Sequence, residues 1–124
     1  MYMKEFIRIS EDERERCQKV ANAFAELYEM YEGMIVLDAG RFGFVKLMYF
    51  DGESFASSDA YNDSIKLFDS LWYDWKLDYM FERVKDTSQG DLTIDELFDL
   101  LNPDQKRYIE RKREEFWQKA FGNT

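Results

Sequence analysis

Large apolar side chains recur at helical spacing through the middle of the chain, and this pattern constrains the fold more than any other feature. Six of them follow one another at steps of four and three residues: Tyr61, Ile65, Phe68, Trp72, Trp75 and Tyr79. Such spacing places them on one side of an α-helix. More apolar residues widen this stripe: Leu67, Leu71, Leu77, Met80, Phe81 and Val84. The pattern predicts a long central helix that Ser58 or Asp59 caps and that runs to about residue 84.

A shorter helical pattern precedes the central helix. Ser10, followed three residues later by Glu13, has the spacing of a capping box. One apolar stripe follows at three- and four-residue steps: Cys17, Val20, Ala21, Phe24, Leu27, Tyr28 and Tyr31. Gly33 stands where a C-terminal cap belongs. We therefore expect one helix between Ser10 and Gly33, preceded at Met1–Ile9 by a strand or an arm.

The segment between these two helices has the pattern of antiparallel strands. Met34–Asp38 and Phe44–Phe50 are rich in aliphatic and aromatic residues and are too short for helices. A glycine-bearing loop of hairpin length joins them, and Asp51 with Gly52 forms a strong signal for a second tight turn. Glu53–Ser57 would then return as a third strand. We expect a three-stranded meander, with a fourth strand only if the N-terminal arm joins it.

Two further capping boxes mark the C-terminal part. Thr93 with Glu96 starts a short helix that ends near residue 101, and Asn102 with Gln105 starts the last helix at Pro103. The inner face of that last helix is predicted to consist of Tyr108, Ile109, Phe116, Ala120 and Phe121. The predicted fold class is α+β, a single domain over residues 1–124 in which a small three-stranded antiparallel meander packs against helices and the C-terminal portion is helical.

Composition excludes several function classes. The net charge of −9 argues against direct nucleic-acid binding, because phosphate contacts need clustered Lys and Arg. The chain has no histidine, the commonest side chain for metal binding and for acid–base chemistry at neutral pH. Its single cysteine, Cys17, lies on the apolar stripe and is expected to be a core thiol. We therefore expect no enzyme activity, no metal and no cofactor.

The sequence also indicates where the protein resides. No stretch approaches the roughly 20 apolar residues that a membrane span needs. The N-terminal residues lack the apolar run of a signal peptide, because a charged segment follows within a dozen residues. A lone cysteine fits a reducing compartment. We expect a cytoplasmic protein that makes no membrane contact.

Charge is divided unevenly along the chain. Between Phe50 and Asp104 there are 14 acidic and 4 basic residues, whereas Gln105–Phe121 has 6 basic and 3 acidic ones. In size and charge the chain is similar to small acidic inhibitors made by phages and mobile elements, including anti-CRISPR and anti-restriction proteins. We expect a non-catalytic protein-binding module whose carboxylates imitate a phosphate backbone and fill the basic groove of a nucleic-acid-binding enzyme.

The candidate partner-binding residues are mostly acidic. The carboxylates are Asp59, Asp63, Asp74, Asp78, Asp95, Glu96, Asp99 and Asp104, and the first hairpin tip adds Arg41 and Phe42. Asp59 and Asp63 are four residues apart, as are Asp74 and Asp78. In the predicted central helix each pair shares one helix face, with Asp63, Asp74 and Asp78 at its solvent-exposed edge.

Three alternatives stay open. The acidic excess can serve solubility alone. A small enzyme or ligand-binding protein would use a pocket between the sheet and the aromatic helix. Nucleic-acid binding would use the basic residues of the last helix, which are Lys106, Arg107, Arg111, Lys112 and Arg113.

Overall fold

The chain folds into five helices and three strands within the residues that the computed structural model describes, which are 9–30, 34–40, 43–50, 54–84 and 92–122. In order these elements are α1 (Glu11–Ala23), α2 (Ala25–Met30), β1 (Met34–Asp38), β2 (Phe44–Phe50), β3 (Ser54–Tyr61), α3 (Ser64–Arg83), α4 (Ile94–Asp99) and α5 (Pro103–Phe121). The strands form one antiparallel sheet in the order β1-β2-β3. The predicted α+β class and the three-stranded meander are therefore confirmed. Residues 1–8 of the predicted N-terminal arm, the predicted helix cap Gly33, and both hairpin tips at residues 41–42 and 51–53 lie outside the described residues.

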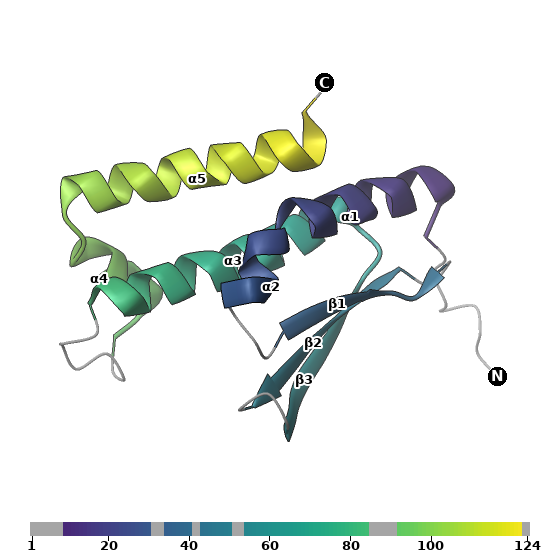
Figure 1. Cartoon of the computed structure of the whole chain (residues 1–124), viewed down its shortest axis with the longest axis horizontal. Coiled ribbons are helices and arrows are strands. Elements are labelled where there is room, and N and C mark those ends of the chain that lie inside the picture. Colours follow the sequence, from purple (N-terminus) through teal and green to yellow (C-terminus); the bar gives the residue numbers. More distant parts are fainter. Residues whose placement is uncertain (1–8, 31–33, 41–42, 51–53, 85–91, 123–124) are drawn as a thin grey trace.

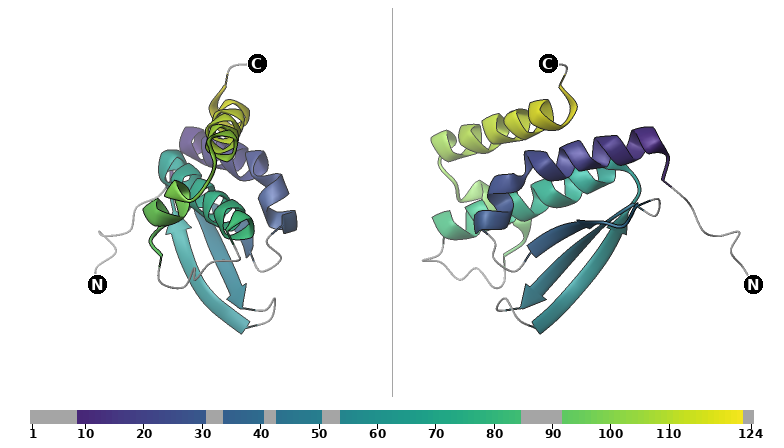
Figure 2. Two further views of the ribbon diagram at one scale, coloured as in Figure 1. Left: turned by 90° about the vertical axis from the view of Figure 1, so that its left-hand side faces the viewer. Right: turned by 45° about the vertical axis from the view of Figure 1, so that its right-hand side comes forward.

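The elements are arranged in layers (Figure 1). The sheet forms one side of the molecule, α1 and α3 lie above it, and α5 lies on top of these two helices. Figure 2 shows from two further directions that the described helices all lie on the same side of the sheet. Consequently α1 and α5 are direct neighbours, although residues 24–102 separate them in the sequence. None of the helices in the described ranges is both long and apolar enough to cross a membrane.

The core is built around phenylalanine rings contributed by separate elements. Phe24, Phe68 and Phe116 are each fully buried. The ring of Phe24 stacks on Phe116 with centroids 4.3 Å apart and meets Phe68 edge-on at 5.3 Å. Trp75 of α3 lies 5.7 Å from Phe116 and joins the same cluster. The predicted role of α3 as the central helix is confirmed, because its aromatic side contacts both α5 and the end of α1.

The predicted first helix is interrupted at Phe24. Its backbone angles, φ −100° and ψ 25°, lie outside the α-helical range, and α2 restarts at the next residue. The N–H of Leu27 donates to the carbonyl oxygen of Phe24 at 2.9 Å, which closes a tight turn. The turn seats the Phe24 ring in the core and directs α2 toward the start of β1 (Figure 1). Tertiary packing of one aromatic ring therefore overrides the helical pattern here.

The third strand is longer than predicted, and α3 starts later. Asp59 pairs with Lys46 of β2, and β3 continues to Tyr61. The cap of α3 is Asp63, whose carboxylate accepts hydrogen bonds from two backbone N–H groups of the first turn at 2.9 and 3.0 Å. The prediction that Ser58 or Asp59 caps this helix is wrong. Hydrogen bonding along β2 stabilises these polar residues as a strand, which local propensity alone did not indicate.

The helix starts predicted at Ser10, Thr93 and Asn102 are confirmed, but the capping box is complete only at α4 and α5. Both hydrogen bonds of the capping box are present at α4 and at α5. At α1 the hydroxyl of Ser10 accepts from the N–H of Glu13 at 3.2 Å, but the Glu13 carboxylate does not return to Ser10. It accepts instead from the N–H of Ser64 at 2.5 Å, at the start of α3. One glutamate thus links the beginnings of two helices.

The first hairpin requires glycine at Gly43, where its loop leads into β2. Gly43 has φ of 101°, and a Cβ atom at this position would lie 2.3 Å from the carbonyl oxygen of Tyr61. Only glycine combines this backbone conformation with so close an approach. The position fixes where β2 begins against the end of β3.

Candidate functional site

Four of the predicted carboxylates come together where α4 leads into α5. Asp95, Glu96 and Asp99 are exposed on the outer side of α4, because Leu97 anchors the opposite side in the core. Asp104 is exposed in the first turn of α5. We call these four residues, Asp95, Glu96, Asp99 and Asp104, the α4 acidic surface.

The carboxylates of this surface differ in their availability to a partner. Glu96 accepts the N–H of Thr93 at 2.8 Å as part of its capping box, and Asp104 pairs with Arg107. In the part of the chain that the structure describes, Asp95 and Asp99 form no ion pair. These two side chains are therefore the best placed to accept hydrogen bonds from another molecule.

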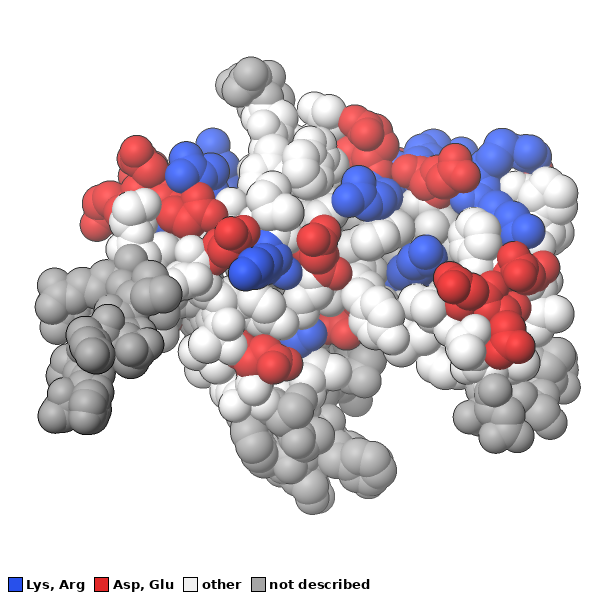
Figure 3. All heavy atoms as spheres, turned by 180° about the vertical axis from the view of Figure 1, so that it is seen from behind, with Lys and Arg blue, Asp and Glu red and all other residues white. Residues whose placement is uncertain are grey.

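Basic side chains border the α4 acidic surface. Lys76 of α3 and Lys106 of α5 both lie over the ring of Phe98, 5.0 and 5.3 Å from its centroid. Figure 3 shows acidic side chains gathered at the end of the molecule where α4 lies, with basic ones beside them, while the two signs alternate across the middle of that face. On this face the α4 acidic surface is thus a local group.

The other four predicted carboxylates lie apart from this surface and from one another. Asp59 is exposed on β3, and Asp63 caps α3, so the prediction that these two share a helix face is wrong. Asp78 is half-buried on α3. Asp74 was expected at a solvent-exposed edge, but its side chain is only 13% exposed and pairs with Lys46 at 2.7 Å. The sheet covers this side of α3, which the helical pattern alone could not show.

Lys46 stands at the centre of a buried polar cluster between the sheet and α3. Besides Asp74, its Nζ donates to Ser70 Oγ at 2.6 Å, and the Tyr61 hydroxyl donates to the same oxygen at 2.8 Å. A nucleophilic serine needs a neighbouring base that takes its proton. Here Ser70 accepts from two donors, and Lys46 is held by a carboxylate. The cluster is suited to holding the sheet on α3 and is poorly suited to catalysis.

No family model, curated protein or solved structure matches this chain. A functional interpretation therefore depends on the arrangement of the side chains described in this section.

A second buried charge, which sequence reasoning missed, lies on α5. Lys112 is 8% exposed, and its Nζ donates to Glu26 Oε1 at 3.1 Å, while the other oxygen of Glu26 accepts from Trp75 Nε1 at 3.3 Å. Burial lowers the pKa of Lys112, but the hydrogen bond and charge of Glu26, with the charge of Glu115, raise it above its ordinary value overall. Lys112 is therefore a charged part of the core.

The basic residues of α5 are mostly engaged with this chain. Arg107 pairs with Asp104, and Arg111 lies over the ring of Tyr108 at 5.3 Å. Arg113 lies over both Phe68 and Trp117. With Lys112 buried, the nucleic-acid-binding alternative loses one of its five predicted residues, and it stays a prediction.

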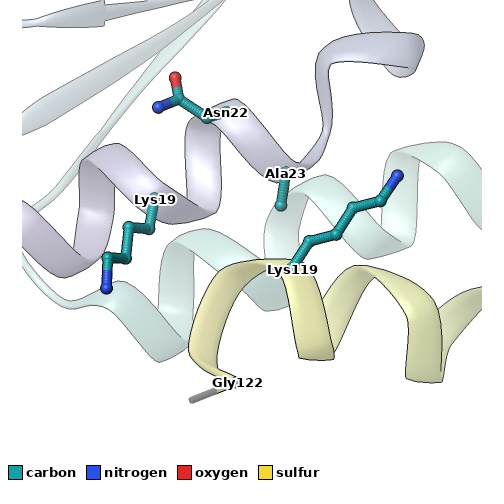
Figure 4. A pocket seen from close by; sticks show the side chains of 5 residues that line it. All are labelled: Lys19, Asn22, Ala23, Lys119 and Gly122. Carbon is teal, nitrogen blue, oxygen red and sulfur yellow. The ribbon is translucent and has the colours of Figure 1, made fainter. Parts of the chain in front are cut away.

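A shallow hollow lies between α1 and α5. It has a volume of about 350 Å³ and is lined by Lys19, Asn22, Ala23, Lys119 and Gly122. Figure 4 shows that the amines of the two lysines point away from each other. They do not converge on a common point, so the hollow lacks the arrangement of an anion site.

Cys17 and the metal-binding types of side chain form no functional site within the described residues. Cys17 is fully buried, and burial, followed by the charges of Glu13 and Asp63, raises the pKa of its thiol to about 11. Within the described ranges, no three side chains of the types that bind metals form a group. Arg41 and Phe42 lie outside the described residues.

Asp78 should make stability depend on pH. Burial, and then the charge of Glu82, raise its pKa above the ordinary value of 3.8. Ionised Asp78 therefore opposes folding at neutral pH, whereas below pH 3.8 the residue is protonated in both states and this cost disappears. Asp78→Asn should accordingly be more stable than the parent at pH 7, and the difference should vanish near pH 3.

Urea unfolding of the two proteins at both pH values measures this effect. The matched control is Asp69→Asn on the exposed side of the same helix, which should leave the unfolding midpoint nearly unchanged. An Asp78→Asn protein that gains nothing at pH 7 would contradict the assignment of a desolvated carboxylate.

Proposed function

We propose that the chain is a non-catalytic protein-binding module that inhibits a nucleic-acid-binding enzyme, as anti-CRISPR and anti-restriction proteins do. The observation that carries this proposal is the exposed row of carboxylates on α4, in a chain whose net charge is −9. Asp95 and Asp99 lie one helical turn apart, about 6 Å along the axis. They supply two negative charges on one side of a rigid element.

Carboxylates in this position are suited to a groove that normally holds phosphates. Arg and Lys side chains bind carboxylates and phosphates through the same charge-assisted hydrogen bonds, and Arg makes bidentate contacts with either group. The overall negative charge of the module would speed its encounter with a basic partner. Leu100, 51% exposed directly after α4, provides an apolar contact beside the charges.

The described side chains also support a binding role over a catalytic one. The chain has no histidine, Cys17 is buried with a raised pKa, and Ser70 accepts hydrogen bonds from Lys46 and Tyr61. The groups that most often act as nucleophile or base are thus missing or engaged in the core.

Charge reversal on α4 tests the proposal. The bait proteins are the parent, the double variant Asp95→Lys/Asp99→Lys, and the control Glu11→Lys/Glu15→Lys. The control changes the same charge at the same spacing, also starting in the first turn of a helix, on α1. Each bait is incubated with a nuclease-treated lysate of the organism that makes the protein, and bound proteins are eluted with salt and identified by mass spectrometry.

We expect the parent and the α1 variant to retain the same nucleic-acid-binding enzyme, which added DNA or RNA displaces. The α4 variant should bind it about 100-fold more weakly, since two interfacial charge pairs of about 1.5 kcal/mol each are lost. Equal affinity of both variants for that enzyme, or capture of no such enzyme, would contradict the proposal.

A further inference from the structure

Two lysines from different helices share one aromatic ring beside the α4 acidic surface. Lys76 of α3 and Lys106 of α5 place their Nζ atoms 5.0 and 5.3 Å from the centroid of the Phe98 ring. Both distances end at the same ring, so the two ammonium groups lie within about 10 Å of each other, roughly one Debye length at 0.1 M salt. Cation–π attraction holds both side chains against Phe98. We call Lys76 and Lys106 the lysine pair.

The lysine pair differs from the buried lysines of this chain in having no counter-ion. Lys46 and Lys112 hold carboxylate oxygens at 2.7 and 3.1 Å. Within the described ranges, Lys76 and Lys106 form no ion pair, and both side chains are partly exposed. The lysine pair therefore has two positive charges available for carboxylates of another molecule.

These two positive charges lie directly beside the negative charges of α4. Asp95 precedes Phe98 by three residues, so the two side chains are neighbours on the helix. Asp99 follows Phe98 directly, and Figure 3 shows basic side chains beside the acidic ones at this end of the molecule. A free phosphate or a nucleic acid is disfavoured at the lysine pair, because these carboxylates repel it. A partner that fits the whole surface must present cations opposite α4 and carboxylates opposite the lysine pair.

A phosphate groove that adjoins carboxylates is typical of enzymes that use a divalent metal. Mg²⁺ is usually bound through one or two carboxylates together with phosphates of the substrate. In nucleases and polymerases these carboxylates hold the metal ions at the phosphate that reacts, and Lys and Arg beside them bind other phosphates. A groove that binds phosphates through cations alone has no such acidic part and would repel the lysine pair.

We infer that the partner is a metal-dependent enzyme that acts on phosphodiesters, and that the lysine pair binds the carboxylates that hold its metal. This inference rests on the proposed function, because it names the kind of enzyme that the α4 acidic surface blocks. Asp95 and Asp99 take the place of substrate phosphates, while Lys76 and Lys106 supply positive charge where the metal otherwise does. The metal and the module therefore compete for the same carboxylates of the enzyme.

Neutralisation of the lysine pair tests this inference on the enzyme that the α4 capture experiment identifies. The variant is Lys76→Gln/Lys106→Gln. The control Lys66→Gln/Lys119→Gln removes the same charge from exposed lysines of the same two helices, α3 and α5. Circular dichroism confirms that both variants are folded. Surface plasmon resonance measures the affinity for the purified enzyme in EDTA and in MgCl2, with NaCl added to equalise the ionic strength.

We expect the parent and the control variant to bind the metal-free enzyme at least tenfold more tightly than the Mg²⁺-loaded enzyme. The lysine-pair variant should bind the metal-free enzyme at least tenfold more weakly than the control variant does, because two interfacial charge pairs are lost. Mg²⁺ should change the affinity of the lysine-pair variant less than threefold, since this variant no longer competes with the metal.

Two kinds of contrary result are distinguishable. A captured enzyme that needs no divalent metal would overturn the inference and leave the proposed function standing. The same holds if the lysine-pair variant binds as tightly as the control, or if it stays as sensitive to Mg²⁺ as the parent, because Mg²⁺ would then act on the carboxylates of α4. Capture of no nucleic-acid-binding enzyme, or equal capture by the α4 and α1 charge-reversal variants, would overturn both proposals.

Discussion

Replacing Phe116 with alanine should lower the free energy of unfolding by about 3–5 kcal/mol, the cost of removing a fully buried phenylalanine and leaving a cavity. The ring stacks on Phe24 at 4.3 Å and contacts Trp75 at 5.7 Å, so its loss removes contacts between α5 and two other helices. Urea or thermal unfolding followed by circular dichroism measures the change.

Tyr73 provides the control for this substitution. It is an aromatic residue of α3 whose side chain is 48% exposed, so Tyr73→Ala should change stability by about 0.5 kcal/mol or less. If Phe116→Ala does not fold, Phe116→Leu should still fold with a smaller loss. Equal effects of the Phe116 and Tyr73 substitutions would contradict the described core.

The second large effect is expected at the buried pair of Lys46 and Asp74. Asp74→Ala should destabilise the protein by about 3–5 kcal/mol, because Lys46 would remain buried without its counter-ion. The double variant Lys46→Met/Asp74→Leu removes both charges and should recover most of this loss. Denaturant unfolding of the parent and both variants, all at pH 7, measures the difference.

Substitution of Asp59 tests whether buried Lys46 requires Asp74 itself, and not any neighbouring carboxylate, as its counter-ion. Asp59 lies opposite Lys46 in the sheet, but it is exposed, so Asp59→Ala should have a much smaller effect than Asp74→Ala. A double variant as unstable as Asp74→Ala would show that packing, and not the unpaired charge, causes the loss.

Local signals in the sequence predicted much of the fold. The capping boxes that start α4 and α5 involve residues only three positions apart, so they can be recognised without knowledge of the fold. Strand bounds at β1 and β2 followed from apolar composition and from the glycine loop between them. The grouping of Asp95 and Asp99 likewise follows from their spacing on one short helix.

Features that depend on distant residues could not be predicted in this way. Lys46 and Asp74 are 28 positions apart, and Glu26 and Lys112 are 86 apart, so nothing local indicates that these charges pair in the interior. The extension of β3 to Tyr61 similarly depends on pairing with β2. Sequence pattern alone therefore predicts Asp74 at the surface and Lys112 on an exposed basic helix, and the structure shows both side chains largely buried.

The position of α5 also determines when the protein can fold during its synthesis. While the ribosome is still adding residues beyond α3, Phe24 and Phe68 have been made, but Phe116, which packs against Phe24, has not. A nascent chain that ends before α5 therefore exposes aromatic rings that the finished chain buries. Such intermediates are prone to aggregation and are the usual clients of chaperones. Translation through residue 121 is thus a condition for a closed core, and ribosome pausing shortly before α5 would prolong the vulnerable state.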